Sequence, residues 1–102
     1  MRDIEREVMG ADWCRRRDEY VRASDAVAPI ADAIQELAKQ HRRRLMAVRL
    51  GVLAWDAVQE HDRALAVLVG HVPSPVTGCA TPWGVVSLVR ADNIGHDAVE
   101  AA

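Results

Sequence analysis

The side chains best suited to covalent chemistry stand in a stretch rich in proline and glycine, residues 70–84. Cys79 is a nucleophile by type, and His71, eight residues earlier, is a base by type. They can act together only if the fold brings them within hydrogen-bond reach, and their spacing does not impose this. The simpler interpretation is that Cys79 packs the loop onto the helices with Trp83 as an anchor. We therefore expect a protein that is not an enzyme, and keep a small enzyme with Cys79 as nucleophile as a second alternative.

Metal binding has little support in the sequence. The four histidines show no pairs at spacings of three or four: His41, His61, His71 and His96. Such spacings place two ligands on one helix face, whereas residues adjacent in sequence diverge. Cys14 and Cys79 are far apart and neither belongs to a C-x-x-C pair. We expect no metal, no cofactor and two reduced thiols.

Two runs of three arginines are candidate binding groups. The run Arg15–Arg17 has acids on both sides, so local ion pairing is expected to neutralise it. The run Arg42–Arg44 has no acid between Lys39 and Arg49. It therefore indicates either a solvated face or contact with an acidic protein or nucleic acid. The formal charge of −2 argues against a general polyanion binder, for which a basic domain is expected.

The elements that would position these groups are expected to be helical. Residues 2–22 carry a ragged apolar stripe typical of a helix, and Ser24, Asp25 and Pro29 predict a boundary after it. Residues 29–69 begin with Pro29, contain no other proline and place apolar residues three and four apart, which predicts a second helical region. If this region is interrupted, the bend is expected near Gly51. From Leu45 to Ala57 the apolar residues surround the whole cylinder of such a helix. A helix buried on all sides in so short a chain predicts a homodimer or an obligate partner.

The last third of the chain is predicted to be a loop over residues 70–81, a short helix over 82–91 and a tail over 92–102. Thr81 followed by Pro82 is typical of a helix N-terminus. The alternative is an α+β fold in which residues 64–69 and 85–89 form a minor hairpin, because short β-branched runs are ambiguous.

The segment from Arg43 to Val58 resembles a helix-turn-helix in its first half, with Ala47 where the helices approach, Leu50 before the turn and Gly51 at the turn. This resemblance implies a DNA-binding regulator using residues 42–58, with Arg43, Arg44 and Arg49 as contacts. The second half departs from the pattern, because Ala57 and Glu60 stand where the recognition helix buries branched apolar residues.

Together these observations predict one domain over residues 1–102, an all-α small bundle of two main helices, a Pro/Gly-rich loop and a short C-terminal helix. The favoured function is a small non-enzymatic regulator, inhibitor or assembly component that binds another protein through its apolar helix surface and this loop. The predicted partner-binding residues are Trp83, Arg42, Arg43, Arg44, Pro73 and Pro75. The charged start of the chain and the absence of a long apolar run predict a cytoplasmic protein. Twelve arginines against the single Lys39 indicate a bacterial or phage origin.

Overall fold

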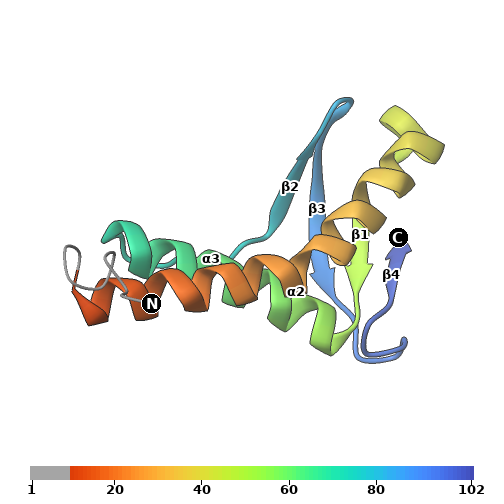
Figure 1. Cartoon of the computed structure of the whole chain (residues 1–102). Helices are drawn as coiled ribbons and strands as arrows, with labels where there is room; N and C mark the ends of the chain where they lie inside the picture. The colour runs from red at the N-terminus through yellow and green to blue at the C-terminus, as the bar shows by residue number, and fades with distance from the viewer. Residues whose placement is uncertain (1–9) are drawn as a thin grey trace.

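The computed structural model describes residues 10–102, which form two long helices and a four-stranded mixed sheet (Figure 1). The helices are α2, Ala11–His41, and α3, Val52–Val69. The strands are β1, Ala47–Leu50; β2, Gly78–Thr81; β3, Gly84–Arg90; and β4, Val99–Ala101. The chain is therefore α+β, and the expectation of an all-α bundle is wrong. Of the first helix expected over 2–22, residues 2–9 lie outside the described residues.

The helical region expected over 29–69 is divided by a strand. Helix α2 ends at His41, a short 3-10 turn, η1, covers Arg42–Arg44, and β1 follows before α3 begins. Leu45, Val48 and Leu50 are buried. The all-round apolar run from 45 to 57 thus combines a central strand with the first turn of a helix. The chain buries Leu45, Val48, Leu50 and Ala54 of this run, whereas Met46 and Leu53 are 75% and 51% exposed, so the run lies only partly inside the fold.

The sheet has the strand order β2-β3-β1-β4 (Figure 1). Strand β1 runs parallel to β3, with α3 in the connection, and antiparallel to β4. Strands β2 and β3 form an antiparallel hairpin. The short helix expected over 82–91 is therefore wrong, because these residues form a turn and β3. The alternative of a strand at 85–89 is correct for that segment, but residues 64–69 are helical and its partners are β1 and β2.

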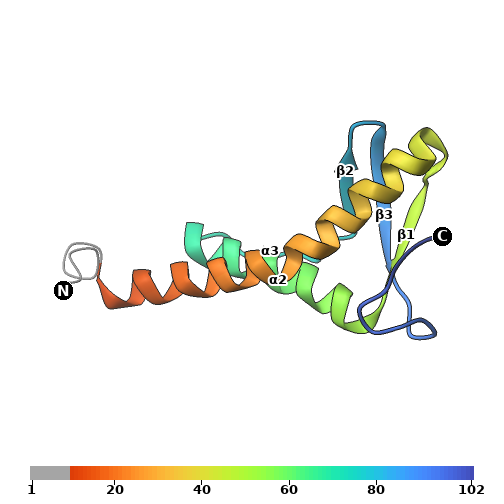
Figure 2. The ribbon, with the colours of Figure 1, turned by 45° about the vertical axis from the view of Figure 1, so that its right-hand side comes forward.

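The predicted boundary near residues 24–29 is absent, because α2 continues through Pro29. The helix changes direction near its middle (Figure 2), as expected where an internal proline removes a hydrogen bond. Packing on both sides of the proline offsets its cost: Ala23 is buried in the first half of α2, and Ile34 and Ala38 are buried in the second.

The core lies between the second half of α2 and one face of the sheet (Figure 2). Its buried members are Ile34, Ala38, Leu45, Val48, Leu50, Ala54, Val86 and Leu88. The first half of α2 packs with α3 and extends beyond the sheet as a two-helix arm (Figures 1 and 2). The radius of gyration is 16.1 Å, against about 13 Å for a compact chain of this length. The molecule is therefore elongated.

One set of backbone hydrogen bonds and one side chain fix the loops around α3. The helix begins after Gly51, where the N–H groups of Leu53 and Ala54 donate to the carbonyl of His96 at 2.9 and 3.0 Å. At the other side of the helix, the Gln59 amide donates to the Val76 carbonyl at 2.8 Å and accepts from its N–H at 2.7 Å. The loop expected over 70–81 is thus pinned at residue 76 and ends at β2.

Candidate binding cleft

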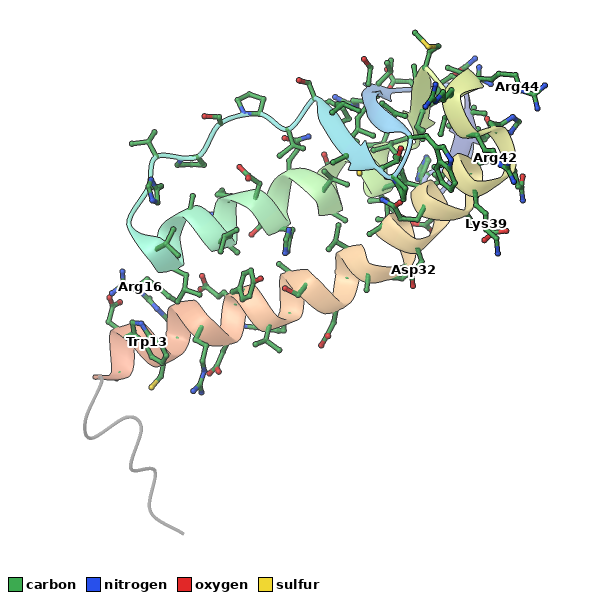
Figure 3. The ribbon with its side chains drawn as sticks, turned by 90° about the horizontal axis from the view of Figure 1, so that it is seen from above. Trp13, Arg16, Asp32, Lys39, Arg42 and Arg44 are labelled. Atoms are coloured by element: carbon green, nitrogen blue, oxygen red, sulfur yellow. The ribbon has the colours of Figure 1, made fainter. Side chains whose placement is uncertain are left out.

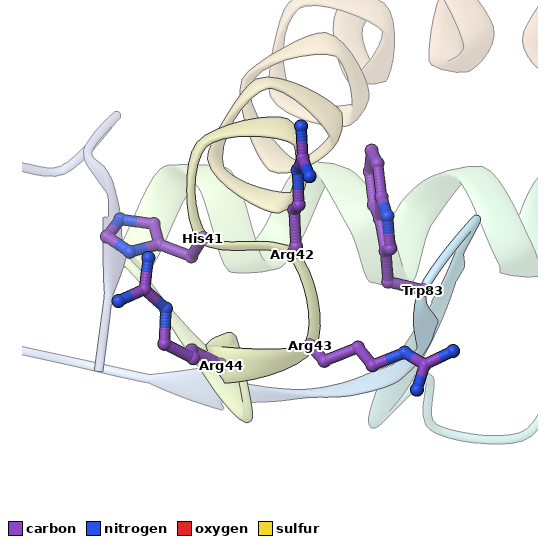
Figure 4. A pocket seen from close by; sticks show the side chains of 5 residues that line it. All are labelled: His41, Arg42, Arg43, Arg44 and Trp83. Carbon is purple, nitrogen blue, oxygen red and sulfur yellow. The ribbon is translucent and has the colours of Figure 1, made fainter.

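A cleft of about 450 Å³ opens where the end of α2 meets the turn between β2 and β3 (Figure 4). Its lining residues are His41, Arg42, Arg43, Arg44 and Trp83. The side chains of Arg42 and Trp83 extend in the same direction, and those of Arg43 and Arg44 extend to either side (Figure 4). The fold thus brings together four of the six residues predicted to bind a partner.

The backbone at Arg42 presents the arginines. Its N–H donates to the carbonyl of Ala38, and its own carbonyl accepts from Leu45 at 3.2 Å. Arg42 has φ 53° and ψ −127°, a conformation that residues other than glycine rarely adopt. Such strain persists only where the surrounding structure imposes it, and it is found preferentially at functional sites. The tight chain reversal that results directs three consecutive cationic side chains away from the core.

Trp83 is held by the hairpin turn. The Thr81 hydroxyl accepts a hydrogen bond from the Trp83 N–H at 3.2 Å and donates one to the Gly84 carbonyl at 2.7 Å. Gly84 has φ 129°, which a residue with a side chain would resist. Trp83 is half-buried and packs against the core. Thr81 therefore caps a turn rather than the helix that its sequence pattern indicated, and it fixes one wall of the cleft.

The cleft is cationic. No carboxylate lines it, and within residues 10–102 none of Arg42, Arg43 and Arg44 forms an ion pair. Lys39 lies one turn earlier on α2, on the same end of the molecule (Figure 3). The position at the carbonyl end of α2 also favours positive charge. Among the described residues no acid pairs with the three guanidinium groups, which leaves them available to an anion.

The other arginine run differs, as the sequence indicated. Asp12 accepts a hydrogen bond from Arg15 at 2.7 Å and forms an ion pair with Arg16 at 2.9 Å, and Arg17 lies 3.4 Å from Asp18. Arg17 also lies over the ring of Trp13, 5.5 Å from its centroid. Trp13 and Arg16 mark the far end of α2 from the cleft (Figure 3). This run is paired and lies on the arm.

The residues expected for DNA binding do not form one surface. Arg49 lies on β1, on the sheet face opposite α2, where its guanidinium is 3.6 Å from Glu100, whereas Arg43 and Arg44 line the cleft. The segment 43–58 is a 3-10 turn, a strand and a helix, so it has no helix-turn-helix geometry. The Gly51 turn of the resemblance is in fact the junction between β1 and α3.

Pro73 and Pro75 lie away from the cleft, in the loop between α3 and β2. Pro75 lines a separate apolar groove of about 340 Å³, together with Val69, Val72 and His71. The loop and the arginines therefore do not form the single binding surface that the sequence suggested.

Cys79 and His71 are also in different places. Cys79 lies on β2, packs against the core and has its Sγ 4.0 Å from the Gln35 side-chain nitrogen. Burial raises the pKa of the Cys79 thiol, which lowers the fraction of reactive thiolate. His71 is exposed at the groove beyond α3. Both cysteines are free, and no cluster of three metal-ligating side chains occurs in the described part of the chain.

The sequence analysis considered His41 only as a metal ligand and did not predict it as a binding residue. The residue is the last of α2 and lines the cleft. Its position directly before three arginines, where a charged run ends a helix, was the available signal.

Searches against protein-family models, curated proteins and solved structures found no match to this chain. No helix within residues 10–102 has the length and apolar character needed to span a bilayer.

Proposed function

We propose that this chain is a non-enzymatic binding protein that takes an acidic segment of another protein into the cleft between Arg42–Arg44 and Trp83. The observation that carries the proposal is three consecutive arginines without ion pairs facing a half-buried tryptophan in one cleft. Arginine and tryptophan are the residue types that most often dominate binding energy at interfaces.

The chemistry of the cleft selects the partner. Planar guanidinium groups bind carboxylates in a two-pronged manner, so clustered glutamates or aspartates match the three arginines. The indole of Trp83 offers apolar area for a side chain flanked by those acids. Exposed ion pairs contribute only about 0.2 to 1 kcal/mol each. Binding should therefore be moderate in affinity and steeply dependent on salt.

Single-stranded nucleic acid is a second candidate, because an aromatic ring beside arginines also suits base stacking and phosphate contact. The net charge of −2 and the separation of Arg49 from the cleft make it the less favoured candidate. A non-enzymatic role is consistent with the raised pKa of Cys79 and with its distance in the fold from His71.

The test uses fluorescence anisotropy with two probes, a short labelled peptide of glutamates around one phenylalanine and a labelled oligothymidylate. We expect the wild-type chain to bind the peptide more tightly than the oligonucleotide at physiological salt. Trp83→Ala should weaken peptide binding by at least about 1 kcal/mol, mainly through faster dissociation. Arg43→Glu should slow association, and less so at high salt.

The matched control is Arg22→Glu, which makes the same charge change on the exposed surface of the arm, away from the cleft. If Arg22→Glu and Arg43→Glu weaken binding equally, only net charge matters and the cleft is not the site. Tighter binding of oligothymidylate would favour the second candidate. Circular dichroism of Trp83→Ala must show a folded protein, because Trp83 also contacts the core.

A further inference from the structure

The two long helices are closed by different kinds of residue. Helix α3 is closed by Gly70, with φ 82° and ψ 24°, the left-handed conformation that often ends a helix and that glycine adopts without steric cost. Helix α2 is closed by Arg42, with φ 53° and ψ −127°. Among residues 10–102, Arg42 is the only residue other than glycine with a positive φ. An arginine therefore stands at a position whose backbone favours glycine.

The side chain of Arg42 does not stabilise this turn. The hydrogen bonds to Ala38 and from Leu45 use backbone atoms of Arg42, so glycine would form them equally well. Within residues 10–102 its guanidinium forms no ion pair. In the same part of the chain, the cation that lies over an aromatic ring is Arg17, so no cation–π contact holds Arg42 on Trp83. Strain at a residue with no such structural role indicates a functional one.

The direction of its side chain distinguishes Arg42 from the two arginines that follow. Arg42 and Trp83 extend side by side in the same direction, whereas Arg43 and Arg44 diverge to either side (Figure 4). Of the three arginines, Arg42 is thus the one whose side chain runs alongside the indole. A ligand that uses both must carry an anion and an apolar group on the same side.

We propose, on the basis of the proposed function, that Arg42 determines the specificity of this cleft by holding one carboxylate of the partner beside an apolar side chain packed on Trp83. In an extended chain, successive side chains point to opposite sides, so two groups on one side are two residues and about 7 Å apart. Short peptides in water do not form stable helices. The preferred partner segment therefore carries an acid and a large apolar residue at positions i and i+2.

The test compares two heptapeptides of identical composition and charge by fluorescence anisotropy, each with the same N-terminal label and an amidated C-terminus. The spaced peptide is Glu-Glu-Ser-Phe-Ser-Glu-Glu, and the adjacent peptide is Glu-Ser-Glu-Phe-Glu-Ser-Glu. Only the spaced peptide has glutamates two residues from phenylalanine. The wild-type chain should bind it about threefold to fivefold more tightly, the upper range for one exposed ion pair.

Arg42→Gly and Arg44→Gly form a matched pair of variants. Arg42→Gly should bring the two affinities within about twofold of each other. Its melting temperature should equal or exceed that of wild type, because relief of strain outweighs the freedom that glycine adds to the unfolded chain. Arg44→Gly should weaken both peptides alike, keep the preference and lower the melting temperature, because Arg44 has a negative φ. Arg42→Gln, which keeps the strained position, should also lose the preference.

The results that overturn the specificity role differ from those that overturn the proposed function. Equal binding of the peptides by wild type, or tighter binding of the adjacent one, refutes the role of Arg42 alone if Trp83→Ala still weakens binding. Loss of the preference in Arg44→Gly but not in Arg42→Gly refutes it too. A fall in melting temperature as large in Arg42→Gly as in Arg44→Gly would show that the arginine is structural. Binding of neither peptide refutes the proposed function and, with it, this role.

Discussion

Gly51→Ala gives the sharpest test of how the second half of the chain is held. Gly51 is buried, with φ −60°, so its backbone conformation is open to any residue. Its constraint is space, because a Cβ built there lies 1.9 Å from the carbonyl oxygen of Gly95 and 2.5 Å from that of His96. Both obstacles are main chain, so the loop before β4 must move to admit a methyl group.

The cost has two parts. Overpacking a well-packed site costs about 1 to 3 kcal/mol. The loop also accepts hydrogen bonds from the N–H groups of Gly51, Leu53 and Ala54, each worth about 1 kcal/mol when lost. The reduced freedom of alanine in the unfolded chain offsets about 0.4 to 1 kcal/mol. We expect a net destabilisation of about 2 to 4 kcal/mol, which for a domain of this size lowers Tm by roughly 10 to 25 °C.

Denaturant unfolding followed by circular dichroism measures the free energy of unfolding. Gly95→Ala in the same loop is the matched control, since a Cβ there meets only the Ala98 methyl at 3.7 Å. It should be neutral or stabilising by up to about 1 kcal/mol. A Gly51→Ala protein within about 0.5 kcal/mol of wild type would refute the reasoning, because the loop would then not press against the start of α3.

Three further outcomes are expected. Gln59→Ala removes both hydrogen bonds to Val76 and should lower the free energy of unfolding by about 1 to 3 kcal/mol. Amide hydrogen exchange should become faster first in residues 70–77. Unchanged exchange there would show that the loop does not depend on Gln59. Trp55→Ala should cost about 1.5 to 3 kcal/mol in denaturant unfolding, less than the 3 to 5 typical of a fully buried tryptophan, because Trp55 is half-exposed at the edge of the core. The Cys79 thiol should react with iodoacetamide more slowly than free cysteine at neutral pH, with a pH midpoint above that of free cysteine, because burial raises its pKa. Because the folded-state pKa is the higher one, this group's contribution to stability is complete below the pKa of the unfolded thiol. It is lost as the pH rises from there through the folded-state pKa. An alkylation rate equal to that of free cysteine would contradict this assignment.

The arginine runs show what charge spacing can determine by itself. Asp12 precedes Arg15 and Arg16 by three and four residues, so their pairing on one helix face follows from local geometry. The absence of acids between Lys39 and Arg49 similarly indicated an unpaired group. Such inferences succeed because the interacting residues are close in sequence and no distant segment interferes.

The position of Trp83 opposite those arginines was beyond sequence reasoning. The two groups lie about forty residues apart, and only the pairing of β1 with β3 and of β2 with β3 brings the hairpin turn to the end of α2. Predicting Trp83 as a binding residue came from its type, whereas its neighbours were decided by sheet topology.

The strand at Ala47–Leu50 marks the same limit. Apolar residues in Leu45–Ala57 fit a buried helix as well as a short buried strand, because periodicity over so few residues does not separate them. The choice was made by distant partners: β1 gains backbone hydrogen bonds from β3 on one side and β4 on the other. Gly51 is the most direct example of this dependence on distant partners. The sequence indicated a possible bend at this glycine, but only the tertiary structure places the Gly95 and His96 carbonyls against it. The sequence alone determined helix-forming stretches and local charge pairs, which depend on neighbours; strand identity and the cleft depended on contacts that only the folded chain makes.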